Sequence, residues 1–146
     1  MEIVIEQLKT LSPGVTDMLN NLLVQLDSNS KKLADEDIRE IIEGQSNRLF
    51  IAREPDGNKM IGMLTLIVYR IPVWKKGWIE DLVVDRAYRN KGIATKLIHY
   101  AVKNARAAGV SSLNFTSRPE RKDANKLYQR LGFEKRNTNI YRMKLQ

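Results

Sequence analysis

Apolar residues in the first third of the chain follow a strand period and then a helical period. The segment Ile3 to Leu8 alternates apolar and polar residues, which predicts a strand. From Val15 to Leu26 the apolar residues recur every three or four positions, which predicts an amphipathic helix. Ser12 followed by Pro13 is typical of a helix start, so we expect that helix to begin there. A shorter apolar stripe predicts a second helix over Leu33 to Glu43.

The middle of the chain has the pattern of consecutive antiparallel strands. Two β-rich runs, "RLFIAR" and "MIGMLTLIVYR", flank the turn-forming sequence Pro55-Asp56-Gly57-Asn58, which predicts a hairpin. A second turn, "IPVWKKG", leads into "WIEDLVVD". Trp74 in this turn either contacts a substrate or partner or covers the sheet edge. We therefore expect three strands in a meander.

The last third begins with a long helix. Apolar residues from Ile93 to Ala108 lie on one side of this helix, and Gly109 ends it. A short strand "SSLNFTS", a helix over Asp123 to Leu131 and a closing pair of strands in "GFEKR" and "NIYRMKL" follow. A strand, a crossover helix and a strand imply one parallel pair in a mostly antiparallel sheet. The expected fold class is therefore mixed α/β, with helices on both faces of the sheet.

Composition narrows the function classes. The 146 residues favour one domain, 1–146. The absence of cysteine excludes disulfides and thiolate chemistry, and a formal net charge of +8 favours an anionic ligand. No apolar run is long enough to span a bilayer, and the N-terminus does not resemble a signal peptide. We expect a cytoplasmic protein.

The turn before the long helix has the features of a phosphate site. Gly92 precedes the first helical residues, whose N–H groups lack intrahelical partners and carry partial positive charge. A glycine there lets an anion approach the backbone, while Arg89, Asn90 and Lys91 add hydrogen-bond donors. The sequence predicts a bound pyrophosphate. An ordinary strand-to-helix turn with solvated charges is the alternative.

Two motifs resemble those of one enzyme family. Arg89-x-x-Gly92-x-Ala94 is similar to the acyl-CoA signature Q/R-x-x-G-x-G/A of the GNAT superfamily of N-acetyltransferases. The segment "DANKLYQRLGF", Asp123 to Phe133, resembles a second family segment. The close resemblance covers about Trp78 to Phe133, and the first half resembles the family in element order alone. Ala94 replaces the final glycine, which slightly narrows the room beside a pyrophosphate.

The resemblance implies acetyl-CoA as donor, a primary amine as acceptor, and no metal. Backbone groups of the fourth strand would align the pantetheine arm and stabilise the oxyanion; these belong to Leu82, Val83 and Val84. The same "LVV" sequence also suits a buried strand. The pyrophosphate would be bound by the turn and first helical residues, which are Arg89, Asn90, Lys91, Gly92, Ile93, Ala94 and Thr95.

Candidate catalytic residues follow from the same resemblance. A neutral amine is the nucleophile, so a base is needed. Glu80, acting through a water, is our first choice and Asp81 the second; in a regular strand the two point to opposite faces. Tyr128 is the candidate acid for the leaving thiolate, and Asn125 would hydrogen-bond the pantetheine. The alternatives are solvated carboxylates at a strand start and a core tyrosine.

Two other functions stay open at this stage. The net charge also suits a small nucleic-acid-binding module, although no helix-turn-helix pattern, zinc-ligand spacing or RNA-binding aromatic strand supports it. A CoA-binding regulator without catalysis is the other alternative. We expect no nucleic-acid or membrane partner, and a homodimer is possible. The acceptor is not identified; in the family it is shaped by segments corresponding to residues 27–33 and 136–139.

Overall fold

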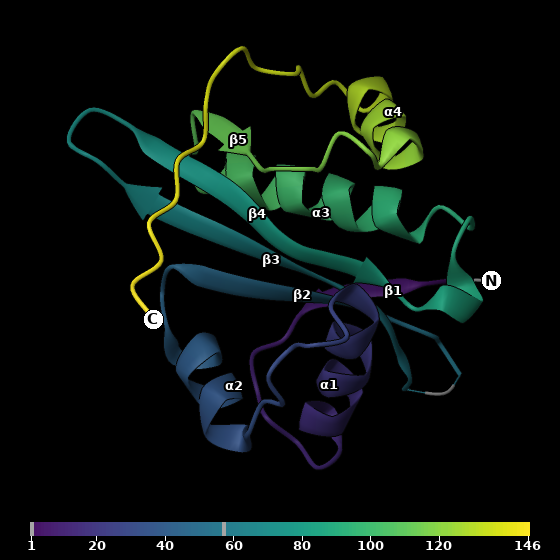
Figure 1. Ribbon diagram of the computed structural model, residues 1–146. Helices are drawn as coiled ribbons and strands as arrows, with labels where there is room; N and C mark the ends of the chain where they lie inside the picture. The colour runs from purple at the N-terminus through teal and green to yellow at the C-terminus, as the bar shows by residue number, and fades with distance from the viewer. Residues whose placement is uncertain (1, 57) are drawn as a thin grey trace. The chain divides into compact units, whose positions relative to one another are not determined.

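The computed structural model describes residues 2–56 and 58–146. Its described strands form one five-stranded sheet in the order β1-β2-β3-β4-β5 (Figure 1). The strands are β1 (Val4–Gln7), β2 (Asn47–Arg53), β3 (Met60–Arg70), β4 (Lys75–Val84) and β5 (Ser112–Asn114). The helices are α1 (Val15–Leu26), α2 (Asp35–Glu43), a short 3-10 turn η1 (Arg86–Tyr88), α3 (Ile93–Ala107) and α4 (Lys122–Arg130).

Pairing in the sheet follows the expected mixed α/β pattern. The first four strands are antiparallel neighbours, whereas β4 and β5 are parallel. Since α3 connects β4 to β5, it is the crossover helix that a parallel pair requires. The predicted fold class is therefore confirmed.

The chain divides into two compact units, a larger one that ends at Phe115 and a smaller one from Thr116 to Gln146. The larger unit contains the whole sheet and the helices α1, α2 and α3, and the smaller unit contains α4. The single domain expected over 1–146 stays a prediction. Within the described residues, no helix is long and apolar enough to cross a membrane.

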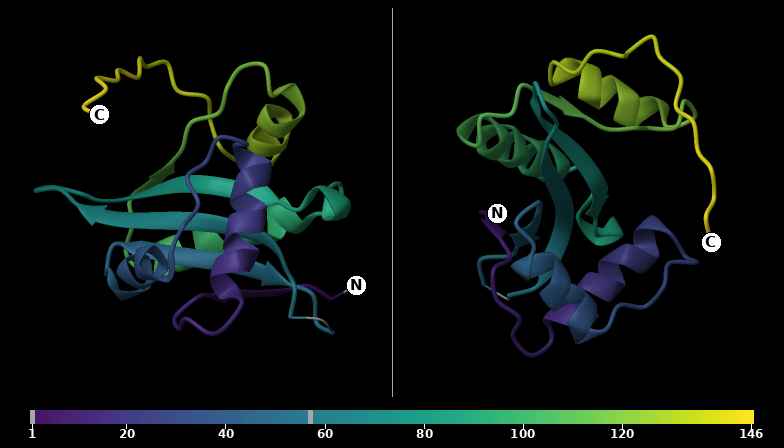
Figure 2. Two further views of the ribbon diagram at one scale, coloured as in Figure 1. Left: turned by 60° about the horizontal axis from the view of Figure 1, so that its bottom comes forward. Right: turned by 90° about the vertical axis from the view of Figure 1, so that its left-hand side faces the viewer.

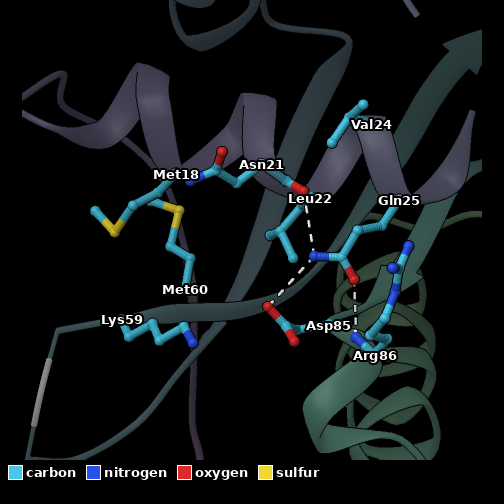
Figure 3. A pocket seen from close by; sticks show the side chains of 9 residues that line it. All are labelled: Met18, Asn21, Leu22, Val24, Gln25, Lys59, Met60, Asp85 and Arg86. Carbon is cyan, nitrogen blue, oxygen red and sulfur yellow. Dashed lines mark hydrogen bonds between the residues drawn. The ribbon is translucent and has the colours of Figure 1, made fainter. Parts of the chain in front are cut away.

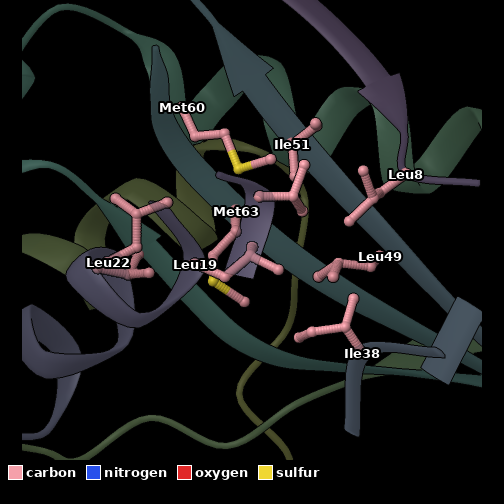
Figure 4. Packing of buried hydrophobic residues seen from close by; sticks show 10 residues of the cluster. Leu8, Leu19, Leu22, Ile38, Leu49, Ile51, Met60 and Met63 are labelled. Atoms are coloured by element: carbon pink, nitrogen blue, oxygen red, sulfur yellow. The ribbon is translucent and has the colours of Figure 1, made fainter. Parts of the chain in front are cut away.

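Alternation along β2 supplies apolar side chains to both faces of the sheet. Leu49 and Ile51 belong to the buried cluster under α1 and α2 (Figure 4). Phe50, between them, is fully buried and its ring lies edge-on to Tyr100 of α3, with centroids 4.9 Å apart. Each such buried side chain stabilises the fold by about 1.5–3 kcal/mol. Helices thus cover both faces of the sheet in the larger unit.

The β3–β4 hairpin extends beyond the rest of the sheet (Figures 1 and 2). Pairing of β2 with β3 stops at Asn47 opposite Ile67, with one further hydrogen bond from the N–H of Val68 to the carbonyl of Ser46 at 2.8 Å. Tyr69 and Arg70, the last residues of β3, pair with β4 alone. The N–H of Ile71 donates to the carbonyl of Trp74 at 2.8 Å and closes the turn. Val73 is 74% exposed and Trp74 53% exposed.

The first helix begins later than the sequence predicted. Its N-cap is Gly14, in the left-handed region with φ of 87°, and no side chain caps the helix. Ser12 contributes its carbonyl oxygen, which accepts from the N–H of Val15 at 3.2 Å. The expected Ser12 cap is therefore wrong, because the left-handed glycine turns the chain between the serine and the first helical residue.

The predicted closing strand pair is also wrong. Residues 134–146 form no strand and are exposed, with Ile140 67% and Tyr141 88% accessible. Alternating apolar residues show what a segment prefers, but a strand also needs a neighbouring backbone to pair with. The two strands around the predicted turn at residues 55–58 are confirmed as β2 and β3, while Gly57 itself lies outside the described residues.

Candidate acyl-transfer site

A β-bulge interrupts β4 at the carboxylates that the sequence singled out. Glu80 pairs with Thr65, and Val83 pairs with Met63, so Asp81 and Leu82 together face a single residue of β3. Asp81 has a φ of 52°, in the left-handed region that aspartate tolerates better than most residues. The strand is therefore not regular here.

The bulge changes which side of the sheet each residue faces. Met63 and Val83 belong to the cluster under α1 and α2, and paired residues of antiparallel strands share a face. Glu80, paired with Thr65 two residues beyond Met63, lies on that same face although it is three residues from Val83. The extra residue thus places an exposed carboxylate beside the α1–α2 core.

Trp78 and Glu80 are hydrogen-bonded neighbours on this face. The indole N–H of Trp78 donates to a carboxylate oxygen of Glu80 at 2.8 Å. Asp81 is exposed as a residue, yet partial burial of its carboxyl group and, secondarily, the charge of Glu80 raise its pKa. A raised pKa suits a group that accepts a proton near neutral pH.

Within the described residues, the second edge of β4 pairs with another strand, β5, over Lys76 to Trp78. No described strand pairs with Leu82 to Val84 on that edge. This open stretch contains Leu82, Val83 and Val84, the residues predicted to align the pantetheine arm. Its backbone groups can therefore accept an extended ligand in the manner of an added strand. The Val83 side chain is buried in the core.

The side chain of Arg89 hydrogen-bonds to one carbonyl oxygen at the end of β4. Its Nε donates to the carbonyl oxygen of Val84 at 3.0 Å. The side chain therefore ties the turn after η1 back to the end of β4. The sequence predicted Arg89 as a phosphate donor, and the structure places its Nε on the protein backbone instead.

The N-terminus of α3 has uncapped N–H groups. The first helical hydrogen bond runs from the N–H of Lys96 to the carbonyl of Gly92, at 3.1 Å. The N–H groups of Ile93, Ala94 and Thr95 precede it and have no partner within the helix. Gly92, the N-cap, has no side chain to satisfy them. These donors and the helix dipole favour an anion.

The space around Gly92 is open. A Cβ atom built at Gly92 would have no atom within 4 Å, so protein packing does not exclude a side chain there. The residue has a φ of 79°, and Asn90 before it has a φ of 61°. The Ile93 side chain is buried, which leaves its backbone N–H as the group that could contact a ligand.

Tyr88 links this loop to the β2–β3 hairpin, a contact that the sequence reasoning missed. The ammonium groups of Lys59 and Lys91 lie 5.2 Å and 5.4 Å from the centre of its ring. Its hydroxyl donates to Glu54, and this hydrogen bond raises the pKa of Tyr88. Lys91, predicted as a phosphate donor, lies over the tyrosine ring here.

Gln25 joins the end of α1 to the start of η1, also unpredicted. Its side-chain oxygen accepts from the N–H of Arg86 at 2.8 Å, and its amide donates to Asp85 at 3.3 Å (Figure 3). Burial raises the pKa of Asp85, but hydrogen bonds from Ala87 and Gln25 and nearby cations outweigh it, so the pKa is lowered. Gln25, Asp85 and Arg86 are among the residues that line an open pocket of about 420 Å³.

The smaller unit contains the remaining predicted residues, both on α4. Asn125 and Tyr128 are three residues apart and share a side of the helix. The Asn125 side-chain amide donates to the carbonyl of Arg118 at 2.9 Å, so one of its donor hydrogens is used within the unit. Tyr128 is 8% exposed.

The sequence from residue 16 to residue 133 matches the model of the Acetyltransferase (GNAT) family. The chain belongs to this family. The match includes the bulge in β4, the turn before α3, and α4. The resemblance stated from the two motifs is therefore confirmed.

Curated relatives of this GNAT chain align with it over short stretches. An uncharacterized N-acetyltransferase, YhdJ of Bacillus subtilis (strain 168), is 40% identical over 57 residues, 38% of this chain and 40% of that protein. The N-alpha-acetyltransferase MAK3 of Arabidopsis thaliana is 38% identical over 58 residues, 40% of this chain and 30% of that protein. The aligned part thus spans two fifths or less of either relative.

Solved structures share the fold over nearly the whole chain. A Trypanosoma brucei acetyltransferase superposes with a TM-score of 0.82 at 19% identity, covering 99% of this chain and 100% of its own. Glucosamine-6-phosphate N-acetyltransferase from Arabidopsis thaliana gives 0.79 at 19% identity, covering 98% and 99%. The aminoglycoside N-acetyltransferase AAC(6')-Iy in complex with CoA gives 0.81 at 21% identity, covering 99% and 95%.

Proposed function

We propose that the protein transfers an acetyl group from acetyl-CoA to a primary amine, by direct attack of the amine while both substrates are bound. The observation that carries the proposal is the open edge of β4 followed by uncapped N–H groups of Ile93 to Thr95 behind Gly92. The extended pantetheine arm of acetyl-CoA needs an open strand edge, and the pyrophosphate next to it needs free N–H groups. CoA-bound members of the same fold add support.

Backbone groups bind the acetyl donor, acetyl-CoA. The N–H groups of Ile93, Ala94 and Thr95 bind the pyrophosphate, helped by the helix dipole. Leu82 to Val84 hydrogen-bond the pantetheine arm, and Asn125 contributes a further hydrogen bond. An N–H group of this edge stabilises the oxyanion that forms on the acyl carbonyl. Acetyl-CoA supplies an activated thioester, whose carbonyl carbon is the electrophile.

Two carboxylates are the candidate proton acceptors, and a phenol is the proton donor. Glu80, through a water, removes the proton from the acceptor ammonium, and Asp81 with its raised pKa is the second candidate. Attack of the amine forms the C–N bond and places a negative charge on the carbonyl oxygen, and collapse of this tetrahedral intermediate breaks the C–S bond. Tyr128 donates a proton to the departing thiolate, so the products are an N-acetylated amine and free CoA. The Tyr128 assignment rests on the resemblance of the α4 segment to its family counterpart.

A thermal melt with acetyl-CoA, and with ATP as the charge control, tests the binding step. A ligand at a hundred times its Kd adds about 2.7 kcal/mol of stability and raises the Tm by several degrees. We expect this shift with acetyl-CoA and little with ATP. Equal shifts would contradict the proposal and favour a general anion surface, including one for nucleic acid.

Release of CoA thiol in the presence of amines tests the transfer step. The chain contains no cysteine, so a thiol reagent reports CoA alone without background from the protein. Thiol release that depends on both substrates supports the transferase. A thermal shift without thiol release for any amine would favour the non-catalytic CoA-binding regulator.

A further inference from the structure

Beyond the α1–α2 core, the sheet presents a strip of partly exposed side chains. We call it the acceptor strip. Its members form three cross-strand pairs on the face that Met63 and Val83 share. The pairs are Thr65 with Glu80, Ile67 with Trp78, and Tyr69 with Lys76. None of the six side chains is buried, whereas the neighbouring positions on the α3 face, such as Leu66 and Ile79, are.

The chemistry of the acceptor strip changes along its length. The carboxylate of Glu80 lies at the bulge, beside the proposed acyl-transfer position. The rings and methyl groups of Trp78 and Ile67 form an apolar middle. Lys76 lies at the hairpin end, next to Tyr69. With a rise of about 3.3 Å per residue, Glu80 and Lys76 have Cα atoms about 13 Å apart.

Positive charge dominates the hairpin end. Arg70 and Lys75 follow Tyr69 and precede Lys76 in the chain, and no aspartate or glutamate occurs from Tyr69 to Ile79. The hairpin extends beyond the sheet (Figure 2), and its cations, of which Arg70 is exposed and Lys75 and Lys76 are half-buried, can meet a ligand there. Such a surface attracts an anionic group and repels a cationic one.

The acidic start of α2 does not offset this charge on the acceptor side. The Asp35 carboxylate accepts a hydrogen bond from the Thr16 hydroxyl. The Asp37 carboxylate accepts from the N–H of Ala34 at 2.8 Å and caps the helix. Both carboxylates therefore have local structural roles at the start of α2.

We propose that the acceptor is a primary amine whose apolar body ends in an anionic group roughly 10 to 13 Å from the amine. This inference rests on the proposed acetyltransferase function. The amine lies at Glu80, the body on Trp78 and Ile67, and the anion at Lys76. The N–H of Trp78 holds the Glu80 carboxylate while leaving the ring free for the body. A peptide amino terminus with an acidic fourth residue and a small amine with a phosphate or carboxylate share this chemistry.

Three tetrapeptides with free amino termini and amidated carboxyl termini, so that no terminal carboxylate is present, test the charge preference. Ala-Leu-Ala-Glu, Ala-Leu-Ala-Gln and Ala-Leu-Ala-Lys differ only in the last side chain, and kcat/KM is measured by CoA thiol release. We expect the glutamate peptide to exceed the glutamine peptide, and that in turn the lysine peptide, by about fivefold each, the scale of an exposed ion pair. Equal values, or the reverse order, would overturn the inference.

Two small amines distinguish the source of the shared chemistry. 8-Aminooctanoate carries an amine and a carboxylate at the two ends of an apolar chain, and spermidine is a polycation. Acetylation of 8-aminooctanoate above that of the glutamate peptide would identify a small anionic acceptor, and the opposite result a peptide. Spermidine turnover above both would overturn the inference.

Lys76→Glu tests the residue itself, with Lys103→Glu as the matched control. Lys103 is an exposed residue of α3 on the other side of the sheet, so both variants change the net charge equally. We expect Lys76→Glu to reverse the order of the glutamate and lysine peptides at an unchanged Kd for acetyl-CoA. A similar effect of Lys103→Glu would overturn the inference. Acetyl-CoA binding without acetylation of any of these amines would overturn it too, while absence of acetyl-CoA binding would refute the proposed function instead.

Discussion

Two glycines that flank α3 allow the proposed phosphate site to be tested with a matched control. Gly92 precedes the helix with φ of 79°, and Gly109 follows it with φ of 78°. A Cβ built at either position would meet no atom within 4 Å. Gly92→Ala and Gly109→Ala therefore impose the same backbone strain at opposite ends of one helix, and only the first lies where the pyrophosphate is proposed to bind.

The two substitutions should cost similar stability. An alanine in the left-handed region costs about 1–2 kcal/mol. Loss of glycine's freedom in the unfolded chain returns about 0.4–1 kcal/mol. The net loss is about 1 kcal/mol, which lowers the Tm by about 4 °C at this chain length.

Affinity for acetyl-CoA should separate the two variants. A methyl group at Gly92 extends into the open space before the N–H groups of Ile93 to Thr95 and keeps a phosphate from them. Loss of one hydrogen bond to a charged group costs about 1.5–3 kcal/mol, or roughly ten- to a hundredfold in Kd. Titration calorimetry with acetyl-CoA measures this directly. The same Kd for both variants, with equal Tm losses, would refute the phosphate site.

Other substitutions address catalysis, acid–base behaviour and the α1–η1 link. Tyr128→Phe should lower kcat by roughly a hundredfold at an unchanged Kd for acetyl-CoA, and an unchanged kcat would remove its acid role. Because the pKa of Asp81 is raised in the folded state, that state binds more protons than the unfolded state between the ordinary and the raised pKa. The stability of the folded state therefore falls as the pH rises through this interval. Asp81→Asn should therefore raise the Tm at pH 7 but not below the ordinary pKa; a gain of the same size at both pH values would contradict the cause given for the shift. Gln25→Ala should weaken acetyl-CoA binding about threefold to tenfold at constant kcat, because the N–H of Arg86 loses its partner before the phosphate loop; a lower kcat with an intact Kd would contradict this.

The larger part of the fold follows from the pattern of apolar residues. The stripe of α1 and the continuous apolar run of β2 correspond to buried positions, and the crossover rule then gives the parallel pair. Helix starts are less certain, since capping depends on local dihedral angles. Pro13 indicated the approximate start of α1, but the N-cap is Gly14, whose backbone is in the left-handed region.

The phosphate turn could be predicted because its chemistry is local. Gly92 at a helix start determines both the backbone conformation and the open space beside it. Contacts between distant segments could not be predicted in the same way. Gln25 meets Asp85 and Arg86 across 60 and 61 residues, and Tyr88 meets Glu54 across 34, and no local pattern reports these pairings.

The bulge in β4 shows why a regular pattern fails at a candidate catalytic position. In a regular strand, Val83 and Glu80 would face opposite sides of the sheet, because their spacing is odd. With Val83 in the α1–α2 core, Glu80 would then point toward the buried α3 face, beside side chains such as Leu66 and Ile79. An unpaired carboxylate buried there would cost several kcal/mol. The extra residue, with Asp81 accepting a left-handed backbone, removes that cost and leaves Glu80 exposed to solvent. The irregularity and the carboxylate therefore depend on each other, and an odd spacing between a core valine and a strand glutamate is the signal in the sequence that points to both.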